Sequence, residues 1–233
     1  MMRLRITKAI LLKQIKDTIK NKVILIQFIM FPLLTVALVN SVDIVNMPEN
    51  FFINLFTTMF IGMAPMVSLS SIIAEEKEGK TLRVLFMSGV KASEYLIGVS
   101  IYVIVLCMCG GAVMGLQANY TKEEFLAYLI IILTGIIVSA ILGSIIGIYS
   151  KNQMRATSIT VPLMMVFSMF PMISYFNNKF RMVSRFFYSQ QISNLLESIS
   201  NIRLTLETVL VIVANLFLFL FISIIIFWKK GIE

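Results

Sequence analysis

Six long intervals of the chain contain no charged side chain, and this feature limits the fold more than any other. They lie between Lys22 and Asp43, Glu49 and Glu75, Glu94 and Lys122, Glu124 and Lys151, Arg155 and Lys179, and Glu207 and Lys229. A helix needs about 20 mainly apolar residues to cross a bilayer core roughly 30 Å thick, and each interval is long enough. The chain is also 58% hydrophobic and only 14% charged, whereas a typical soluble domain is about 25% charged. We therefore expect an all-α, polytopic membrane protein that forms one domain over 1–233, with six transmembrane helices at about 23–42, 51–74, 95–118, 125–150, 156–178 and 208–228.

Lysine and arginine are distributed unevenly among the segments that connect these expected spans. The N-terminal segment, the connections after the second and fourth spans, and the C-terminal tail hold 15 of the 20 basic residues. Cytoplasmic connections carry such an excess in multi-pass membrane proteins. We expect a multi-pass protein of the cell membrane with both termini in the cytoplasm, and the richness in Ile, Lys and Asn favours a bacterial source. Because this asymmetry explains most of the net charge of +8, we expect no nucleic acid partner.

The residues that usually carry catalysis or metal binding are scarce. The chain has no His, and Cys107 and Cys109 lie together within an expected span without the spacing of a redox pair. We expect both cysteines to be packing residues, and we expect no catalytic residue, no metal site and no bound cofactor in this chain. The six intervals hold no Asp, Glu, Lys, Arg or His, which argues against a proton-driven carrier but leaves open a sodium site built from carbonyls and hydroxyls. The first apolar run is too long for a signal peptide, so we expect it to be retained.

Two segments outside the expected spans are amphipathic. In 1–22 an apolar stripe opposes a lysine-rich face, which predicts a helix lying in the membrane interface, acting either as a mechanical lever or as a positive-inside anchor. Its stripe consists of Leu4, Leu11, Leu12, Ile15 and Ile19. The external connection 179–207 carries apolar residues at helical spacing, which predicts short re-entrant helices or an interfacial helix lying flat. These residues are Ile192, Leu195, Leu196 and Ile199.

Small and polar residues recur on two of the expected spans. Gly135, Ser139, Gly143 and Gly147 share one stripe, which lets another helix approach closely. On the second span a polar, proline-kinked face would either line a translocation path or hold helices together by hydrogen bonds. That face consists of Asn54, Thr58, Pro65 and Ser68, and the fifth span has a similar mixture in Ser158, Thr160, Pro162, Ser168 and Pro171.

The cytoplasmic connection 75–94 is dense in charges of both signs. Its Gly79-Lys80-Thr81 suggests a nucleotide-binding loop, but the first glycine of that motif is replaced by Ala74, and an expected membrane helix precedes the segment instead of a strand. We therefore reject a nucleotide site in this chain. Energy for transport would instead enter through the cytoplasmic surface.

This order of parts resembles the permease subunits of type-2 ABC exporters, which have an ABCG-like fold. The segment from Glu76 to Arg83 is similar to the family's E-K-E-R-G-T-L-E coupling segment, with the glycine and the basic residue exchanged. The segment from Ser150 to Arg155 resembles the polar loop before the fifth span. In the external connection, Phe186-Phe187-Tyr188-Ser189 stands where the family often has an Asn-Pro pair.

The resemblance implies that a separate ATPase subunit, binding ATP and Mg, docks beneath the coupling connection. Two permeases, identical or paralogous, would work with two ATPases. The implied coupling residues are Glu75, Glu76, Lys77, Glu78, Gly79, Lys80, Thr81, Arg83, Lys151 and Arg155. Spans rich in Met and Phe suit hydrophobic or amphipathic cargo, and we favour a peptide toxin or antimicrobial peptide over a lipid or a drug. Two other classes stay open: a sodium-coupled carrier or channel, and a membrane sensor or scaffold that transports nothing.

Overall fold

The computed structural model describes residues 4–20, 22–41, 50–201 and 204–230, and within them it contains helices and no strand. The helices are α1 (Leu4–Lys20), α2 (Lys22–Ser41), α3 (Phe51–Glu78), α4 (Thr81–Met87), α5 (Ala92–Gly115), α6 (Lys122–Tyr149), α7 (Gln153–Phe176), α8 (Asn178–Ser184), α9 (Tyr188–Glu197), the 3₁₀ turn η1 (Ile199–Asn201) and α10 (Leu206–Lys230). The expectation of an all-helical chain is confirmed for this part of the sequence. The side chains of Leu4 and Ile19, which belong to the expected apolar stripe, lie outside the described residues.

Among the described residues, five helices are long and apolar enough to cross a membrane: α3, α5, α6, α7 and α10. The first expected span corresponds to α2, whose described apolar stretch, Leu25–Ser41, is shorter than a full crossing. Six spans therefore remain a prediction. The 28 residues of α3 extend about 42 Å, so this helix continues beyond a bilayer core by several residues.

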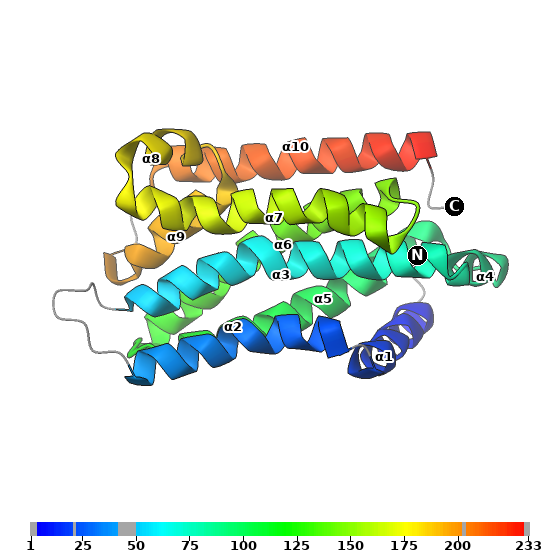
Figure 1. The fold of residues 1–233 in the computed structure, drawn as a ribbon, viewed down its shortest axis with the longest axis horizontal. Helices are drawn as coiled ribbons and strands as arrows, with labels where there is room; N and C mark the ends of the chain where they lie inside the picture. Colours follow the sequence, from blue (N-terminus) through cyan, green and yellow to red (C-terminus); the bar gives the residue numbers. More distant parts are fainter. Residues whose placement is uncertain (1–3, 21, 42–49, 202–203, 231–233) are drawn as a thin grey trace.

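Helix α3 lies at the centre of the bundle and packs against α2, α5, α6, α7 and α9 (Figure 1). Its closest neighbour is α6, whose stripe of small residues faces it. A Cβ atom on Gly143 would lie 2.6 Å from the Met66 carbonyl oxygen, and the Ser139 hydroxyl donates to the Ile61 oxygen at 2.5 Å. Gly135 and Gly147 lie equally close to α3 side chains. The two backbones therefore approach each other along the whole stripe.

Side-chain caps fix the starts of three helices, α6, α7 and α8. The oxygen atoms of Thr121, Asn152 and Asn177 each accept a hydrogen bond from a backbone N–H in the first turn of the helix that follows. The donors are Glu124 N at 3.3 Å, Arg155 N at 2.9 Å and Lys179 N at 3.0 Å. These caps set the starting points of α6, α7 and α8.

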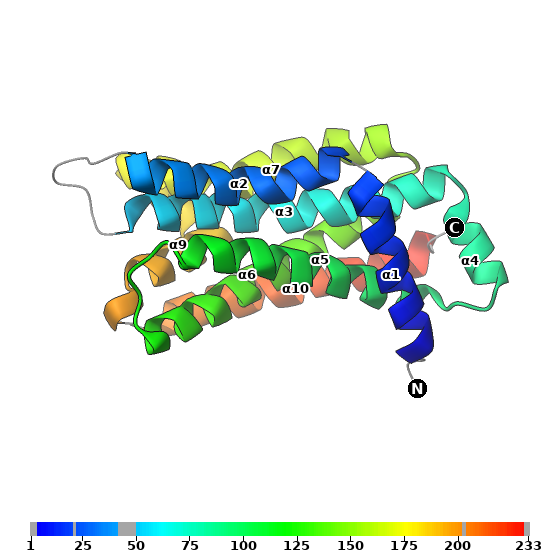
Figure 2. The same cartoon turned by 90° about the horizontal axis from the view of Figure 1, so that it is seen from below.

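Helix α1 crosses the long axis of the bundle instead of following it (Figure 2). It packs against α5 and the end of α3 through Ile10, Gln14 and Thr18, which are all buried. Leu12 and Ile15, from the predicted apolar stripe, point away from the protein and are exposed. The helix therefore has a packing face that includes two polar residues and a separate apolar face available to lipid.

Different helices lie at the two ends of the bundle (Figure 1). One end gathers α1, α4, the connection between α6 and α7, and the last turn of α10. The opposite end holds α8 and α9. Helix α9 is largely buried and packs against α3, α6, α7 and α10, so the predicted external helix forms part of the bundle. Its Ile192, Leu195, Leu196 and Ile199 are all buried.

Candidate functional site

The last turn of α3 joins the central helix to α1. Glu76 is 8% exposed, and its Oε1 atom lies 2.8 Å from Lys13 Nζ. The same oxygen accepts a hydrogen bond from Gln14 Nε2 at 2.5 Å. A charge-assisted pair with an added hydrogen bond is the arrangement that holds a buried carboxylate in place. Glu76 therefore anchors α1 to the core.

The next two residues of the same turn bind two other helices. Lys77 Nζ donates to the Ile148 carbonyl oxygen at 2.9 Å, near the C-terminus of α6, where a positive charge is favourable. Glu78 Oε2 accepts from the Gln153 backbone N–H at 2.9 Å, at the N-terminus of α7. Residues 76–78, which we call the 76–78 junction, thus connect α3 to α1, α6 and α7.

Helix α4 follows this junction and stands out at the end of the bundle (Figure 1). Lys80 precedes it in a left-handed conformation with φ of 55°, and Thr81 Oγ1 donates to the Glu76 carbonyl oxygen at 3.0 Å. Within α4, Leu82 is buried against the core, whereas Val84 and Met87 are 66% and 81% exposed. The helix is therefore fixed on one side and presents apolar surface on the other.

The remaining predicted coupling residues surround α4 or the connection between α6 and α7. Glu75, Gly79 and Arg83 are exposed, as is Lys151. The Arg155 guanidinium lies 5.0 Å from the centre of the Tyr149 ring, in a cation–π contact. Sequence reasoning treated the charges of 75–83 as one docking set. The structure divides them into the 76–78 junction, which bonds to neighbouring helices, and an outward group on and around α4.

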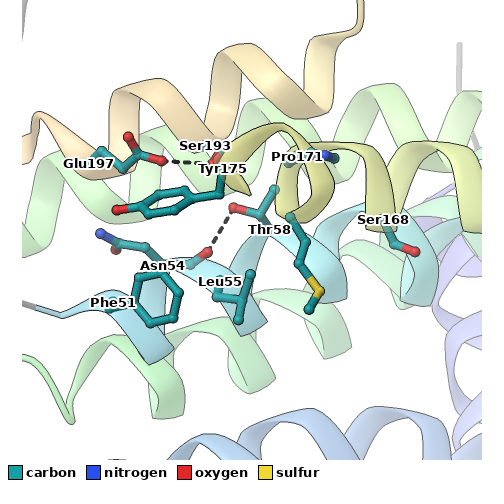
Figure 3. Close-up of a pocket in the computed structure, with 10 residues that line it drawn as sticks. Phe51, Asn54, Leu55, Thr58, Ser168, Pro171, Tyr175, Ser193 and Glu197 are labelled. Carbon is teal, nitrogen blue, oxygen red and sulfur yellow. Dashed lines mark hydrogen bonds between the residues drawn. The ribbon is translucent and has the colours of Figure 1, made fainter. Parts of the chain in front are cut away.

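A pocket of about 210 Å³ opens at the opposite end of the bundle, between α3, α7 and α9 (Figure 3). We call it the outer pocket. It is lined by Phe51, Asn54, Leu55, Thr58, Ser168, Pro171, Met172, Tyr175, Ser193 and Glu197.

The predicted polar face of α3 is only partly in this pocket. Asn54 and Thr58 line it, whereas Pro65 and Ser68 are buried further along the helix. The Ser68 hydroxyl has no hydrogen-bond partner within the part of the chain that the structure describes. The four predicted path residues therefore share a helix face without sharing one cavity.

The polar groups of the pocket are held by neighbouring elements. Asn54 Nδ2 donates to the Leu196 carbonyl oxygen at 3.3 Å, and Tyr120 donates to Asn54 Oδ1 at 3.3 Å. The Ser193 hydroxyl donates to Glu197 Oε1, also at 3.3 Å. The first of these bonds joins α9 to the N-terminal turns of α3, and the other two orient Asn54 and Glu197.

Glu197 is the residue that the sequence analysis missed. It is the one Asp or Glu between Glu124 and Glu207, and this isolation in the sequence could have identified it as a candidate site residue. Much of its side chain is exposed, but desolvation by the surrounding helices raises the pKa of its carboxyl above the ordinary value of 4.5. The Ser193 hydroxyl and the Arg181 guanidinium lower that pKa and oppose the shift only in part.

In the described ranges, no three His, Cys, Asp or Glu side chains are grouped in a way that could hold a metal ion. On α5, Cys107 is buried and Cys109 is exposed, and both are free thiols.

Residues 6–229 match the family described as ABC-2 family transporter protein. A search of curated proteins gave no match. The family match covers nearly the whole chain and agrees with the apolar helices that are long enough to cross a membrane. The chain therefore belongs to the ABC-2 transporter family and is a multi-pass membrane permease of an ABC exporter, a class that associates with an ABC ATPase subunit.

Proposed function

We propose that this permease moves hydrophobic or amphipathic cargo out of the cell, powered by two copies of a separate ATPase subunit that bind ATP and Mg. A second permease, identical or paralogous, completes the transport unit. The cargo we favour is a peptide toxin or antimicrobial peptide. Both termini then lie in the cytoplasm of a bacterial cell.

The observation that carries this proposal is the connection between α4 and the 76–78 junction. An ATPase that binds the exposed face of α4 pulls on a helix that is anchored through Leu82 and follows directly from α3. The junction passes that displacement to α1, α6 and α7 through the bonds of Glu76, Lys77 and Glu78. Packed helices move as rigid elements, so a small displacement at one end changes the spacing of helices at the other.

The exposed face of α4 suits a protein partner of mixed character. Val84 and Met87 supply apolar contact area, and Arg83 with Lys80 supplies positive charge at its edge. Lys151 and Arg155 extend this positive surface toward the start of α7. Apolar contacts surrounded by charges are the usual composition of a protein interface.

The cargo assignment depends on the apolar composition of the bundle. Methionine and phenylalanine side chains adapt to varied apolar shapes, and α7 exposes Met165, Met169 and Phe176 along its length. The outer pocket adds polar groups where α7 approaches α3 and α9. Such a route favours molecules that combine apolar and polar parts.

Co-purification tests this proposal. The tagged permease is extracted from its native membrane, and ATPase activity is measured in the eluate for the wild type and for Val84→Glu with Met87→Glu. We expect the wild type to carry ATPase activity and the α4 variant to lose it. Met182→Glu is the matched control, because Met182 is 69% exposed on α8 at the other end of the bundle. Equal ATPase activity in all three preparations would contradict docking at α4, and its absence from all three would contradict the proposal itself.

A further inference from the structure

Two aromatic rings and one carboxylate meet at the mouth of the outer pocket (Figure 3). The rings of Phe51 and Tyr175 have their centres 5.1 Å apart with an angle of 74° between their planes. They belong to α3 and α7, and Glu197 reaches the same pocket from the end of α9. Two nearly perpendicular rings form a corner, and the carboxylate stands beside it.

Glu197 is the charged residue among those that line this pocket. The side-chain amide of Asn54 is already engaged, because it donates to Leu196 and accepts from Tyr120. The carboxylate of Glu197 accepts one bond of 3.3 Å from Ser193, which leaves most of its capacity unused. The pocket therefore offers a negative acceptor beside walls that combine apolar and neutral polar side chains.

Arg181 is a positive group whose charge acts on Glu197. It lines a second cavity of about 220 Å³, which shares Tyr175 and Glu197 with the first. In the described part of the chain Arg181 forms no ion pair with Glu197, and the ion pair at this end joins Arg185 to Glu207 at 3.6 Å. Arg181 therefore weakens the negative potential of the pocket without neutralising its carboxylate.

We propose that the outer pocket binds the cationic head group of the cargo, a quaternary or primary ammonium. This assignment rests on the proposed function and names the substrate class more closely, as cationic and amphipathic. An ammonium group is attracted to the faces of aromatic rings, and a carboxylate beside the rings adds a full opposite charge. An anionic head group would meet Glu197 with the same sign and would be repelled.

The size of the pocket limits what it can hold. Drug-sized ligands occupy cavities of about 300–1,000 Å³, so a cavity of about 210 Å³ accommodates a head group or a single side chain. The rest of an amphipathic cargo would lie outside it, against Leu55 and Met172 on the pocket walls and the neighbouring apolar helix surfaces. Recognition of the head alone is compatible with variable tails.

Direct binding tests the assignment. The permease with its co-purified partner is placed in lipid nanodiscs, and binding of tritiated octyltrimethylammonium is measured with octyl sulfate and octanol as probes of the same tail length. We expect the cationic probe to bind more tightly than both others. Glu197→Gln should weaken its binding about tenfold, the order expected for one partly screened charge.

Two further variants separate a site effect from a folding defect. Tyr175→Leu keeps an apolar side chain and removes the ring face, so we expect about threefold weaker binding of the cation and unchanged binding of octanol. Glu207→Gln is the matched control, because it removes an exposed carboxylate of the same end that lies outside the pocket, and binding should stay within about twofold of wild type. Equal affinity for the three probes, or equal losses in Glu197→Gln and Glu207→Gln, would overturn the proposal.

Failure of this inference is distinguishable from failure of the proposed function. If the preparation carries ATPase activity but binds cationic and neutral probes equally, the head-group assignment is wrong, whereas the proposed export function stands. If the cationic probe binds through Glu197 and no ATPase accompanies the permease, the site stands and the energy source is wrong.

Discussion

Removing the charge of Glu76 should release α1 from the bundle. Glu76 Oε1 lies 2.8 Å from Lys13 Nζ and 2.5 Å from Gln14 Nε2, and both partners belong to α1. The variant Glu76→Gln keeps the shape of the side chain and one possible hydrogen bond, but it removes the ion pair. Lys13 then faces a neutral amide, and the hydrogen bond with Gln14 loses its charge assistance.

The size of the effect follows from the geometry. At 2.8 Å two unit charges attract by about 1.5 kcal/mol in water and by about 6 kcal/mol at an effective dielectric constant of 20. The side chain of Lys13 is 34% exposed, so solvent screens the pair and a value near the lower limit applies. The charge-assisted bond to Gln14 adds to it, and the desolvation of Glu76 opposes it. We expect a net loss of about 2 kcal/mol for the docking of α1.

Thiol labelling of α1 measures this loss. Thr18 is 3% exposed on the packing face of α1, so Thr18→Cys, in a background where Cys109→Ser removes the exposed native thiol, reacts with maleimide only when α1 lifts away. A loss of about 2 kcal/mol corresponds to a roughly 30-fold faster reaction. The control is Glu75→Gln, whose carboxylate is next in sequence and exposed. A labelling rate for Glu76→Gln within about twofold of the control would refute the anchoring role.

The other predictions concern packing, backbone strain and pH. Gly143→Ala should lower Tm by about 5 °C in a thermal melt, because its Cβ would lie 2.6 Å from a backbone oxygen of α3. Gly79→Ala, with 3.4 Å of room, should change it by less than about 1 °C. Lys80→Gly should raise Tm by about 1–2 °C, because φ is 55° at this position and glycine adopts it without strain. Binding of an ammonium probe should fall as the pH drops through the raised pKa of Glu197, with half of the binding lost above pH 4.5 while Arg181 stays charged; pH-independent binding down to 4.5 would contradict the role of this carboxylate.

The sequence predicted the helices well because their signal is local. Charge-free intervals reflect the cost of placing charge in lipid, and five of the six coincide with helices that are long enough to cross. The stripe from Gly135 to Gly147 is similarly local, and its members all face α3. The sixth interval corresponds to α2, whose described apolar stretch is shorter.

The sequence was less informative about the two functional ends, because their contacts join distant segments. Glu76 appeared to be a docking charge, but its partners lie 62 residues or more away in sequence, on α1. The apolar stripe predicted for α1 included Leu12 and Ile15, which are exposed. The packing face instead includes Gln14, a polar residue that hydrophobic periodicity does not detect. Such pairs follow from how helices cross, which no local pattern determines.

The exchanged glycine in the coupling segment leaves the left-handed position of the turn to a lysine. The left-handed residue is Lys80, which occupies the position where the family's motif has glycine, whereas Gly79 is right-handed with φ of −74°. The turn between α3 and α4 therefore places a lysine in the left-handed conformation that glycine would adopt without strain.

ATP-driven transport in reconstituted vesicles tests the central claim, that energy enters this permease through α4 from a separate ATPase. The permease and its co-purified partner are reconstituted, and movement of an amphipathic ammonium compound is followed with ATP, without ATP, and with a sodium gradient in place of ATP. We predict that transport requires ATP and falls to background when Val84→Glu and Met87→Glu disrupt the exposed face of α4. Transport by the permease alone, driven by the sodium gradient and unaffected by the α4 substitutions, would contradict the account.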